Sequence, residues 1–161
     1  MRASVAVLFI VFGVLEWVST GDGADLILQN LNHQCLRCLC HVATGCDLTM
    51  GCVKGYCGPY KISKIYWKDA DEVTLPDDDK ERAGAYEDCA ISYNCAQKLV
   101  VNYMSKYGRD CNGDGVTNCE DYMMINFNGG VQCQTPMNRS EIAIQWVTKF
   151  KMCNPLSHIW I

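Results

Sequence analysis

The sequence has no excess of positive charge: 14 Lys and Arg residues stand against 18 Asp and Glu residues, giving a formal net charge of −4. A weakly acidic protein gains no long-range electrostatic attraction to nucleic acid, to anionic lipid or to the anionic polymers of bacterial walls. The charge balance therefore argues against nucleic-acid binding and against unaided electrostatic docking on bacteria.

Long hydrophobic runs are also scarce. The apolar run near the N-terminus extends from Ala3 to Leu15, between Arg2 and small residues at 19–21, and it falls well short of the ~20 residues that a membrane span needs. This pattern predicts a secretory signal peptide over residues 1–22, followed by a single domain over residues 23–161. No later segment is long and apolar enough to cross a bilayer, so we expect a secreted, extracellular protein with no membrane span.

Cysteine, by contrast, is abundant. All 12 cysteines follow the predicted signal peptide, and an even number in a secreted chain favours six disulfides. The alternative is a zinc site at Cys35, Cys38 and Cys40, but no second CxxC or paired histidine motif follows at ligand spacing. The run from Cys35 to Cys57 is rich in Gly and Thr, and it predicts turns and short elements rather than long helices.

Two amphipathic helices are predicted from apolar spacing. In the first, Leu99, Tyr103 and Tyr107 belong to a stripe with spacings of three and four, and Gly108 stands where a C-terminal cap belongs. The second begins near Ser140 and is expected to bury one face, made of Ile142, Trp146, Val147 and Phe150.

The middle of the chain is expected to contain less helix. Tyr60, Ile62 and Ile65 alternate with polar residues after a Gly-Pro turn, which predicts a short strand or hairpin leading into the aromatic pair Tyr66 and Trp67. The acidic segment 68–87 is predicted to be a solvated surface loop.

The stretch DCNGDGVTNCED resembles a calcium-binding loop. Asp110, Asn112 and Asp114 occupy loop positions one, three and five, Gly115 occupies position six, and Asp121 occupies position twelve. Aspartate at position twelve is shorter than the usual glutamate, and Cys111 and Cys119 lie inside the loop. The alternative is therefore an Asx/Gly turn held by disulfides without an ion.

One N-glycosylation sequon, Asn138-Arg139-Ser140, follows Pro136 at a predicted helix entrance. This position predicts an exposed acceptor at Asn138.

Four motifs together are similar to the invertebrate-type lysozyme family, also called the destabilase family: CLRCLCHVATGC, GCVKGYCGPYKISKIYWKDA, YMSKYGRDCNGDGVTNCEDY and NGGVQC. The resemblance covers residues 35–153. It implies an α+β, mostly helical, disulfide-rich lysozyme-like fold with a small β-hairpin beside a sugar cleft. It also implies a partner, bacterial peptidoglycan or a related amino-sugar polymer, a role in defence or digestion, and no cofactor, with Ca²⁺ at the loop as the open alternative.

The resemblance also shows what this sequence lacks. Family members hydrolyse the β-1,4 linkage between N-acetylmuramic acid and N-acetylglucosamine with a Glu acid and an Asp partner, and the chemistry requires both carboxyl groups. Ala43 occupies the position of the acid and Gly55 that of its partner, so no catalytic residue is assigned. Asp47 and His41 are weak surrogates.

A sugar cleft of this family is expected to use aromatic faces that stack on sugar rings. The alternative is that Tyr66 and Trp67 belong to the core. The predicted substrate-binding residues are Gly58, Pro59, Tyr60, Lys61, Ile62, Tyr66, Trp67 and Tyr103.

Three short-range disulfides are reachable and fit the habit of the family: Cys40–Cys46, Cys52–Cys57 and Cys89–Cys95. The other six cysteines allow about 15 pairings; they are Cys35, Cys38, Cys111, Cys119, Cys133 and Cys153.

The sequence thus favours a secreted lysozyme-like protein that binds peptidoglycan with reduced or lost hydrolysis. Two alternatives stay open: an active lysozyme that uses displaced acids such as Asp47, and a non-catalytic, disulfide-stapled extracellular protein that acts through protein contacts.

Overall fold

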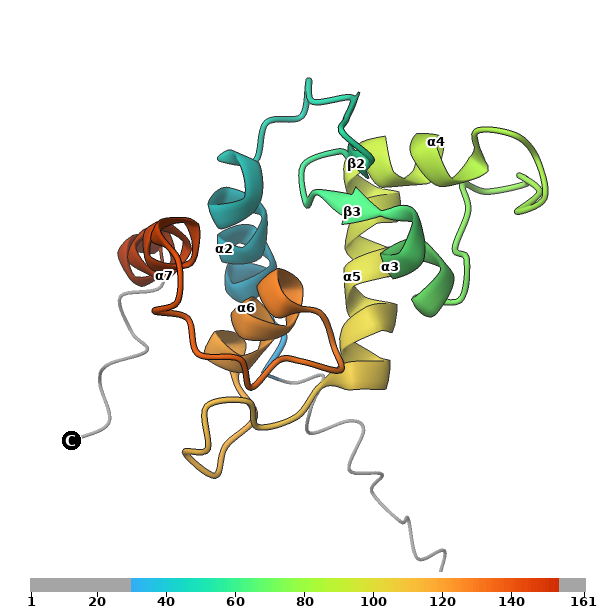
Figure 1. The fold of residues 1–161 in the computed structure, drawn as a ribbon. Coiled ribbons are helices and arrows are strands. Elements are labelled where there is room, and N and C mark those ends of the chain that lie inside the picture. Colours follow the sequence, from blue (N-terminus) through green and yellow to red (C-terminus); the bar gives the residue numbers. More distant parts are fainter. Residues whose placement is uncertain (1–29, 154–161) are drawn as a thin grey trace, which may run out of the picture.

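The computed structural model describes residues 30–153, so the predicted signal peptide lies outside the described residues. This part of the chain folds into helices with one small antiparallel sheet (Figure 1). The helices are α2 His33–Thr44, α3 Lys64–Asp69, α4 Ala85–Ile91, α5 Tyr93–Tyr107, α6 Cys119–Asn128 and α7 Glu141–Cys153, and the strands are β1 Cys52–Val53, β2 Tyr56–Cys57 and β3 Ile62–Ser63. The predicted mostly helical α+β class is confirmed.

Helix α2 overturns the expectation of turns in the first cysteine-rich segment. Asn32 caps its N-terminus by accepting a 2.9 Å hydrogen bond from the N–H of Cys35. Leu36, Leu39 and Val42 recur at helical spacing on its buried face. The prediction failed because it treated clustered cysteines as markers of turns, whereas here they add to the apolar face of a helix.

Helix α5 confirms the first predicted helix. Its stripe, including Leu99, Val100 and Met104, is buried with 0% exposure, and in Figure 1 it runs between α6 on one side and α3 on the other. The helix ends at Gly108, whose N–H donates a 2.7 Å hydrogen bond to the carbonyl of Met104.

Helix α7 confirms the second predicted helix but not all of its predicted buried face. Phe150 is buried, and Trp146 and Val147 are half-buried against the core. Ile142, however, is 68% exposed, and Ala143 is buried in its place. Ala143, Val147 and Phe150 are spaced by four and three residues and so share one face of α7, and α7 packs on α2.

The sheet has the order β1-β2-β3, with Val53 opposite Tyr56 and Cys57 opposite Ile62. The predicted strand or hairpin is therefore present, and it leads directly into α3, where Ser63 caps the helix by accepting a 3.1 Å hydrogen bond from the N–H of Tyr66. The sheet lies beside α3 and α4, away from α7 (Figure 1).

The acidic segment after α3 is a loop with its own ion pairs. Arg82 bonds to Asp78 at 2.7 Å, and Lys80 bonds to Glu72 at 2.9 Å. The loop is anchored on the core side by Trp67, whose Nε1 donates to the carbonyl of Val73 at 2.8 Å. The predicted surface loop is thus present, up to the start of α4 at Ala85.

All 12 cysteines are paired. The three expected local bridges are present, and two of the other three bridges connect α2 to α6 and α7. The pairs are Cys40–Cys46, Cys52–Cys57, Cys89–Cys95, Cys35–Cys119, Cys38–Cys153 and Cys111–Cys133. Within residues 30–153, no helix combines the length and the hydropathy that crossing a membrane requires.

Candidate functional site

The last turn of α2 holds the first position at which a catalytic acid is expected. Gly45 ends the helix in the left-handed conformation (φ 76°), and its N–H donates to the carbonyls of Cys40 and His41. A glycine suits this cap because it adopts positive φ without steric cost. Ala43 lies on the buried side of this turn with 5% exposure, whereas His41 is exposed. The position therefore presents a methyl group to the interior.

The turn of the β1–β2 hairpin holds the second position. Lys54 and Gly55 both have positive φ, 53° and 82°, as a two-residue type I′ turn requires. Gly55 is exposed, and a Cβ added there would meet no atom within 4 Å. Its carbonyl accepts a 3.3 Å hydrogen bond from the Tyr86 hydroxyl. The hairpin therefore has room for an acid at this position, but it carries none.

One hydrogen bond connects the end of α2 to the segment that follows β2, and one close approach packs that segment on α4. The Thr44 hydroxyl donates a 2.7 Å hydrogen bond to the carbonyl of Pro59. Gly58 packs so closely on α4 that a Cβ added there would overlap the carbonyl oxygen of Ala90. The helix that carries Ala43 is thus hydrogen-bonded to the segment that follows the hairpin carrying Gly55.

Most of the predicted sugar-binding residues are interior residues. Tyr60, Ile62 and Trp67 are 0–3% exposed, and Gly58 and Pro59 are also buried. Side chains at this burial present no face to a ligand. Among the eight predicted residues Lys61 alone is exposed.

Tyr66 and Tyr103 stack on each other, with ring centroids 3.7 Å apart. The Tyr103 hydroxyl accepts a 2.9 Å hydrogen bond from the N–H of Gly130. Burial raises the pKa of the Tyr66 hydroxyl well above its usual value. The core alternative therefore describes Tyr66 and Trp67, and Tyr103 is a core residue as well; aromatic content alone did not distinguish core from cleft.

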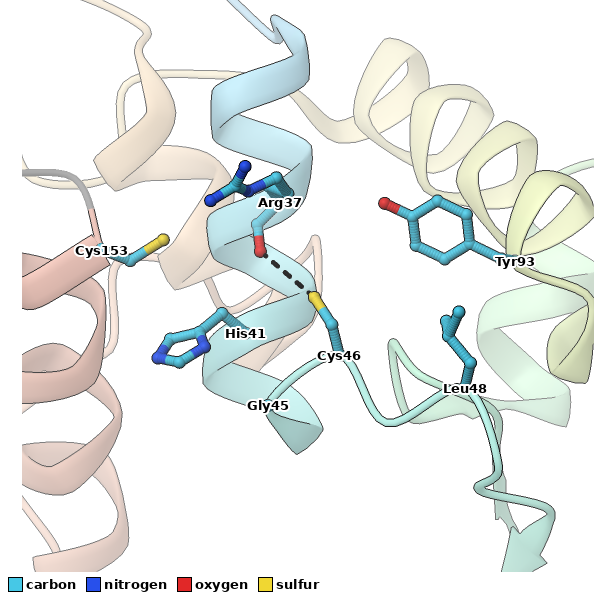
Figure 2. Close-up of a pocket in the computed structure, with 7 residues that line it drawn as sticks. All are labelled: Arg37, His41, Gly45, Cys46, Leu48, Tyr93 and Cys153. Carbon is cyan, nitrogen blue, oxygen red and sulfur yellow. Dashed lines mark hydrogen bonds between the residues drawn. The ribbon is translucent and has the colours of Figure 1, made fainter.

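An open groove of about 350 Å³ crosses the outer face of α2 (Figure 2). Figure 2 shows Arg37 and His41 one turn apart on α2, with Cys153 of α7 on one side and Leu48 and Tyr93 on the other. We call this feature the α2 groove; its lining residues are Arg37, His41, Gly45, Cys46, Leu48, Tyr93 and Cys153.

The sequence analysis missed Arg37, Leu48 and Tyr93. The spacing of Arg37 and His41, four residues apart, would have placed them on one helix face, but the segment was not predicted to be helical. No local signal connects Tyr93 to α2, because the groove is formed by packing.

A family model described as Destabilase matches residues 32–153, which is nearly all of the described chain. The chain belongs to the invertebrate-type lysozyme, or destabilase, family. It is 32% identical over 111 residues to the lysozyme of Magallana gigas, covering 66% of this chain and 72% of that protein. It is also 32% identical over 123 residues to invertebrate-type lysozyme 6 of Caenorhabditis elegans, covering 73% and 80%.

The fold of this lysozyme-family chain is similar to two crystal structures. One is Tapes japonica lysozyme, with a TM-score of 0.54 and 21% identity over 74% of this chain and 88% of that one. The other is Meretrix lusoria lysozyme in complex with Aeromonas hydrophila PliI, with a TM-score of 0.55 and 22% identity over 75% and 88%. At these identities the likeness concerns the fold.

Asp47 is the acid nearest in sequence to the end of α2. Its Oδ1 accepts hydrogen bonds from the N–H and the hydroxyl of Thr49, at 2.8 and 2.6 Å. These bonds, the hydroxyl first, hold the pKa of Asp47 below its usual value. A general acid needs a raised pKa so that it keeps its proton near the working pH. Asp47 is therefore poorly suited to the proton-donating role in this lysozyme-family chain.

The calcium-like loop is organised by hydrogen bonds from its own backbone. Asp110 accepts from the N–H groups of Gly113 and Gly115, at 2.7 and 2.9 Å. Asp121 is buried and accepts from Cys111 and Asn118, at 2.7 and 2.8 Å, which makes it part of the capping box of α6.

The side chains of the four predicted calcium ligands thus form hydrogen bonds within the loop and to the start of α6. Asp114 accepts from Val116 N–H and from the Asn112 amide, and Asp110 and Asp121 hold the ends of the loop. Within residues 30–153 no three His, Cys, Asp or Glu side chains gather in a way that suits a metal ion. This arrangement matches the alternative of an Asx/Gly turn held by a disulfide, here Cys111–Cys133. Asn138 of the sequon is exposed, and its glycosylation stays a prediction.

Proposed function

We propose that this member of the invertebrate-type lysozyme family is a secreted protein that binds bacterial peptidoglycan with reduced or lost hydrolysis of its β-1,4 linkages. Its role would be in defence or digestion. The relatives named lysozyme support the substrate class, and the full pairing of its cysteines suits an oxidising extracellular setting.

One observation carries the proposal: the two positions that the family resemblance assigns to the catalytic carboxyl groups are Ala43 and Gly55, and neither residue has a carboxyl group. Glycoside hydrolysis of this type needs one carboxyl to protonate the leaving oxygen and a second to stabilise or capture the oxocarbenium-like centre. Ala43 offers a buried methyl group, and Gly55 offers no side chain at all. Hydrogen bonds from Thr49 lower the pKa of Asp47, which is the wrong direction for a residue that would replace the general acid.

Binding needs an exposed surface near these positions, and the buried aromatics do not supply it. Tyr56 does: it sits directly after Gly55 in β2, and its side chain is 52% exposed. Among the Tyr, Trp and Phe residues of the described chain, only Tyr56 is exposed. We therefore include Tyr56 and Lys61, rather than Tyr60 and Trp67, in the proposed sugar-binding surface.

The direct test uses oxidised protein without residues 1–22. We would follow the turbidity of a peptidoglycan suspension between about pH 4 and pH 8, where carboxyl-dependent lysozyme chemistry operates, and run a pull-down on the same polymer. Retention on the polymer without clearing supports the proposal. Clearing that disappears in Asp47→Asn would instead favour the displaced-acid alternative, and no retention would favour a protein that acts through protein contacts.

A second test restores the missing groups. Gly55→Asp is sterically open, and Asp tolerates the left-handed conformation better than most residues. We expect Ala43→Glu combined with Gly55→Asp to clear peptidoglycan about tenfold or more faster than the parent, because a positioned general acid alone contributes about 10²-fold or more.

The matched control is Ala43→Gln combined with Gly55→Asn, which has the same size but no carboxyl groups. Equal rates for the two double variants, both shown to be folded by circular dichroism, would mean that the missing carboxyls are not what limits hydrolysis.

A further inference from the structure

The α2 groove has a cationic side without acidic partners. Arg37 and His41 are its only basic lining residues, and no Asp or Glu is among the residues that line it. Within the described chain, the Arg37 side chain makes no ion pair and no hydrogen bond, whereas Arg82 bonds to Asp78 and Arg109 donates to the carbonyls of Gly130 and Val131. The guanidinium of Arg37 is therefore available to a ligand.

The nearest acid by sequence does not compensate this charge. Asp47 is not among the residues that line the groove, and its Oδ1 is engaged by Thr49. An imidazole offers a ring N–H donor in either protonation state, so His41 adds a second donor one turn from Arg37. A guanidinium beside a second N–H donor is suited to a carboxylate, which accepts two parallel hydrogen bonds.

The opposite side of the groove is apolar. The aliphatic side chain of Leu48 lies there and is 59% exposed to solvent. Tyr93 is held in place from behind by Tyr60, with ring centroids 6.1 Å apart and planes 24° apart. Figure 2 shows both side chains across α2 from His41 and Cys153. This side would accept the apolar face of a sugar ring or a small alkyl group.

The geometry points to a further binding site: the α2 groove is a subsite for a carboxylate-bearing muropeptide, with the acid on Arg37 and His41 and the apolar part on Leu48 and Tyr93. This inference rests on the proposed function and extends it, since the stem peptide, which is amide-linked to the lactyl group of peptidoglycan, carries free carboxylates that a neutral amino-sugar polymer lacks. A volume of about 350 Å³ lies at the lower end of the range for small-ligand sites.

The test compares two polymers that share N-acetylglucosamine but differ in charge. Wild-type protein and the variant Arg37→Gln/His41→Gln are bound to insoluble peptidoglycan and to chitin. We expect the variant to lose about tenfold or more of its affinity for peptidoglycan, because charge-assisted hydrogen bonds are the strong ones, and to keep its affinity for chitin. Arg139→Gln is the matched control, since Arg139 is exposed and lies outside the groove.

A soluble probe separates this inference from the proposed function. N-acetylmuramyl dipeptide and the neutral disaccharide of N-acetylglucosamine are titrated into each protein by calorimetry, and the melting temperature confirms that the variants are folded. Binding of the dipeptide by wild type and Arg139→Gln but not by Arg37→Gln/His41→Gln supports the subsite, even if the polymer is not retained. Equal dipeptide binding by all three proteins, or by none of them, overturns it, and polymer retention alone then decides the proposed function.

Discussion

At the scale of single residues, Asp121 shows how one buried carboxylate organises a surface loop. It accepts hydrogen bonds from Cys111 at 2.7 Å and from Asn118 at 2.8 Å, so it joins the start of the loop to the start of α6. Burial raises its pKa, although these N–H groups act in the opposite direction. A residue that looks like a calcium ligand in the sequence is here a structural acceptor.

We expect Asp121→Ala to lower the free energy of unfolding by about 2–4 kcal/mol, because several buried N–H groups lose their acceptor at once. Urea denaturation would measure the loss. Asp114→Ala is the control, since Asp114 is exposed and bonds only within the loop. Similar losses for the two variants would contradict this role for Asp121.

Asp110 leads to a prediction about pH. Hydrogen bonds from Gly115 first, and then Gly113, lower its pKa. A group with a lowered folded-state pKa stabilises the fold above its ordinary pKa of 3.8, and this contribution is lost as the pH falls through the lower folded-state value. We expect Asp110→Asn to flatten the loss of stability on acidification below about pH 4, as measured by thermal unfolding. A profile parallel to that of the parent would count against the assignment.

At the scale of elements, the contact between the hairpin and α4 decides where the sheet lies. Gly58 has a φ of 67° and leaves no room for a Cβ against the Ala90 carbonyl. The adjacent Thr44–Pro59 hydrogen bond brings the end of α2 to the same place. The close packing of the hairpin on α4 therefore depends on Gly58, and the Thr44–Pro59 bond connects α2 to the same segment.

We expect Gly58→Ala to destabilise the protein by roughly 3 kcal/mol or more, because it combines a steric overlap with a strained backbone. Gly55→Ala is the control: it has positive φ but open space around the added Cβ, so its cost should be only about 1–2 kcal/mol. Chemical denaturation compares the two, and equal costs would refute the close approach to α4.

At the scale of the whole molecule, the long-range disulfides determine how the helices are held together. Cys35–Cys119 and Cys38–Cys153 span 84 and 115 residues and connect α2 to α6 and α7. Helix α7 packs on α2, and its last residue, Cys153, lines the α2 groove. Long loops gain most from a cross-link, because their closure removes more freedom from the unfolded chain.

We expect Cys38→Ala/Cys153→Ala to lower the free energy of unfolding by about 5 kcal/mol, and Cys89→Ala/Cys95→Ala by about 2 kcal/mol, by the loop-length dependence of disulfide stabilisation. The short bridge spans 6 residues, and it therefore serves as the control for the loss of a buried disulfide. Denaturation under non-reducing conditions measures both, and the reverse order would contradict the entropic account.

The residues that were predicted well are those whose information is local. The apolar period of α5 and the short spacings of Cys40–Cys46, Cys52–Cys57 and Cys89–Cys95 can be read along the chain, because helix periodicity and small loops involve near neighbours. Helix α2 was missed although its Asn32 cap and its period are local too, because the density of cysteines and glycines was taken as evidence for turns.

The sequence by itself determined the family, the mostly helical class and the absence of carboxyl groups at 43 and 55, since each depends only on residue identity and order. The tertiary structure alone decided that Tyr60 and Trp67 are interior while Tyr56 is exposed, and that Arg37 and Tyr93 share one groove. The physical reason is that burial and neighbourhood are properties of packed elements: α5 lies far along the chain from α2 and the hairpin, and the faces of these elements are defined only once they are packed together.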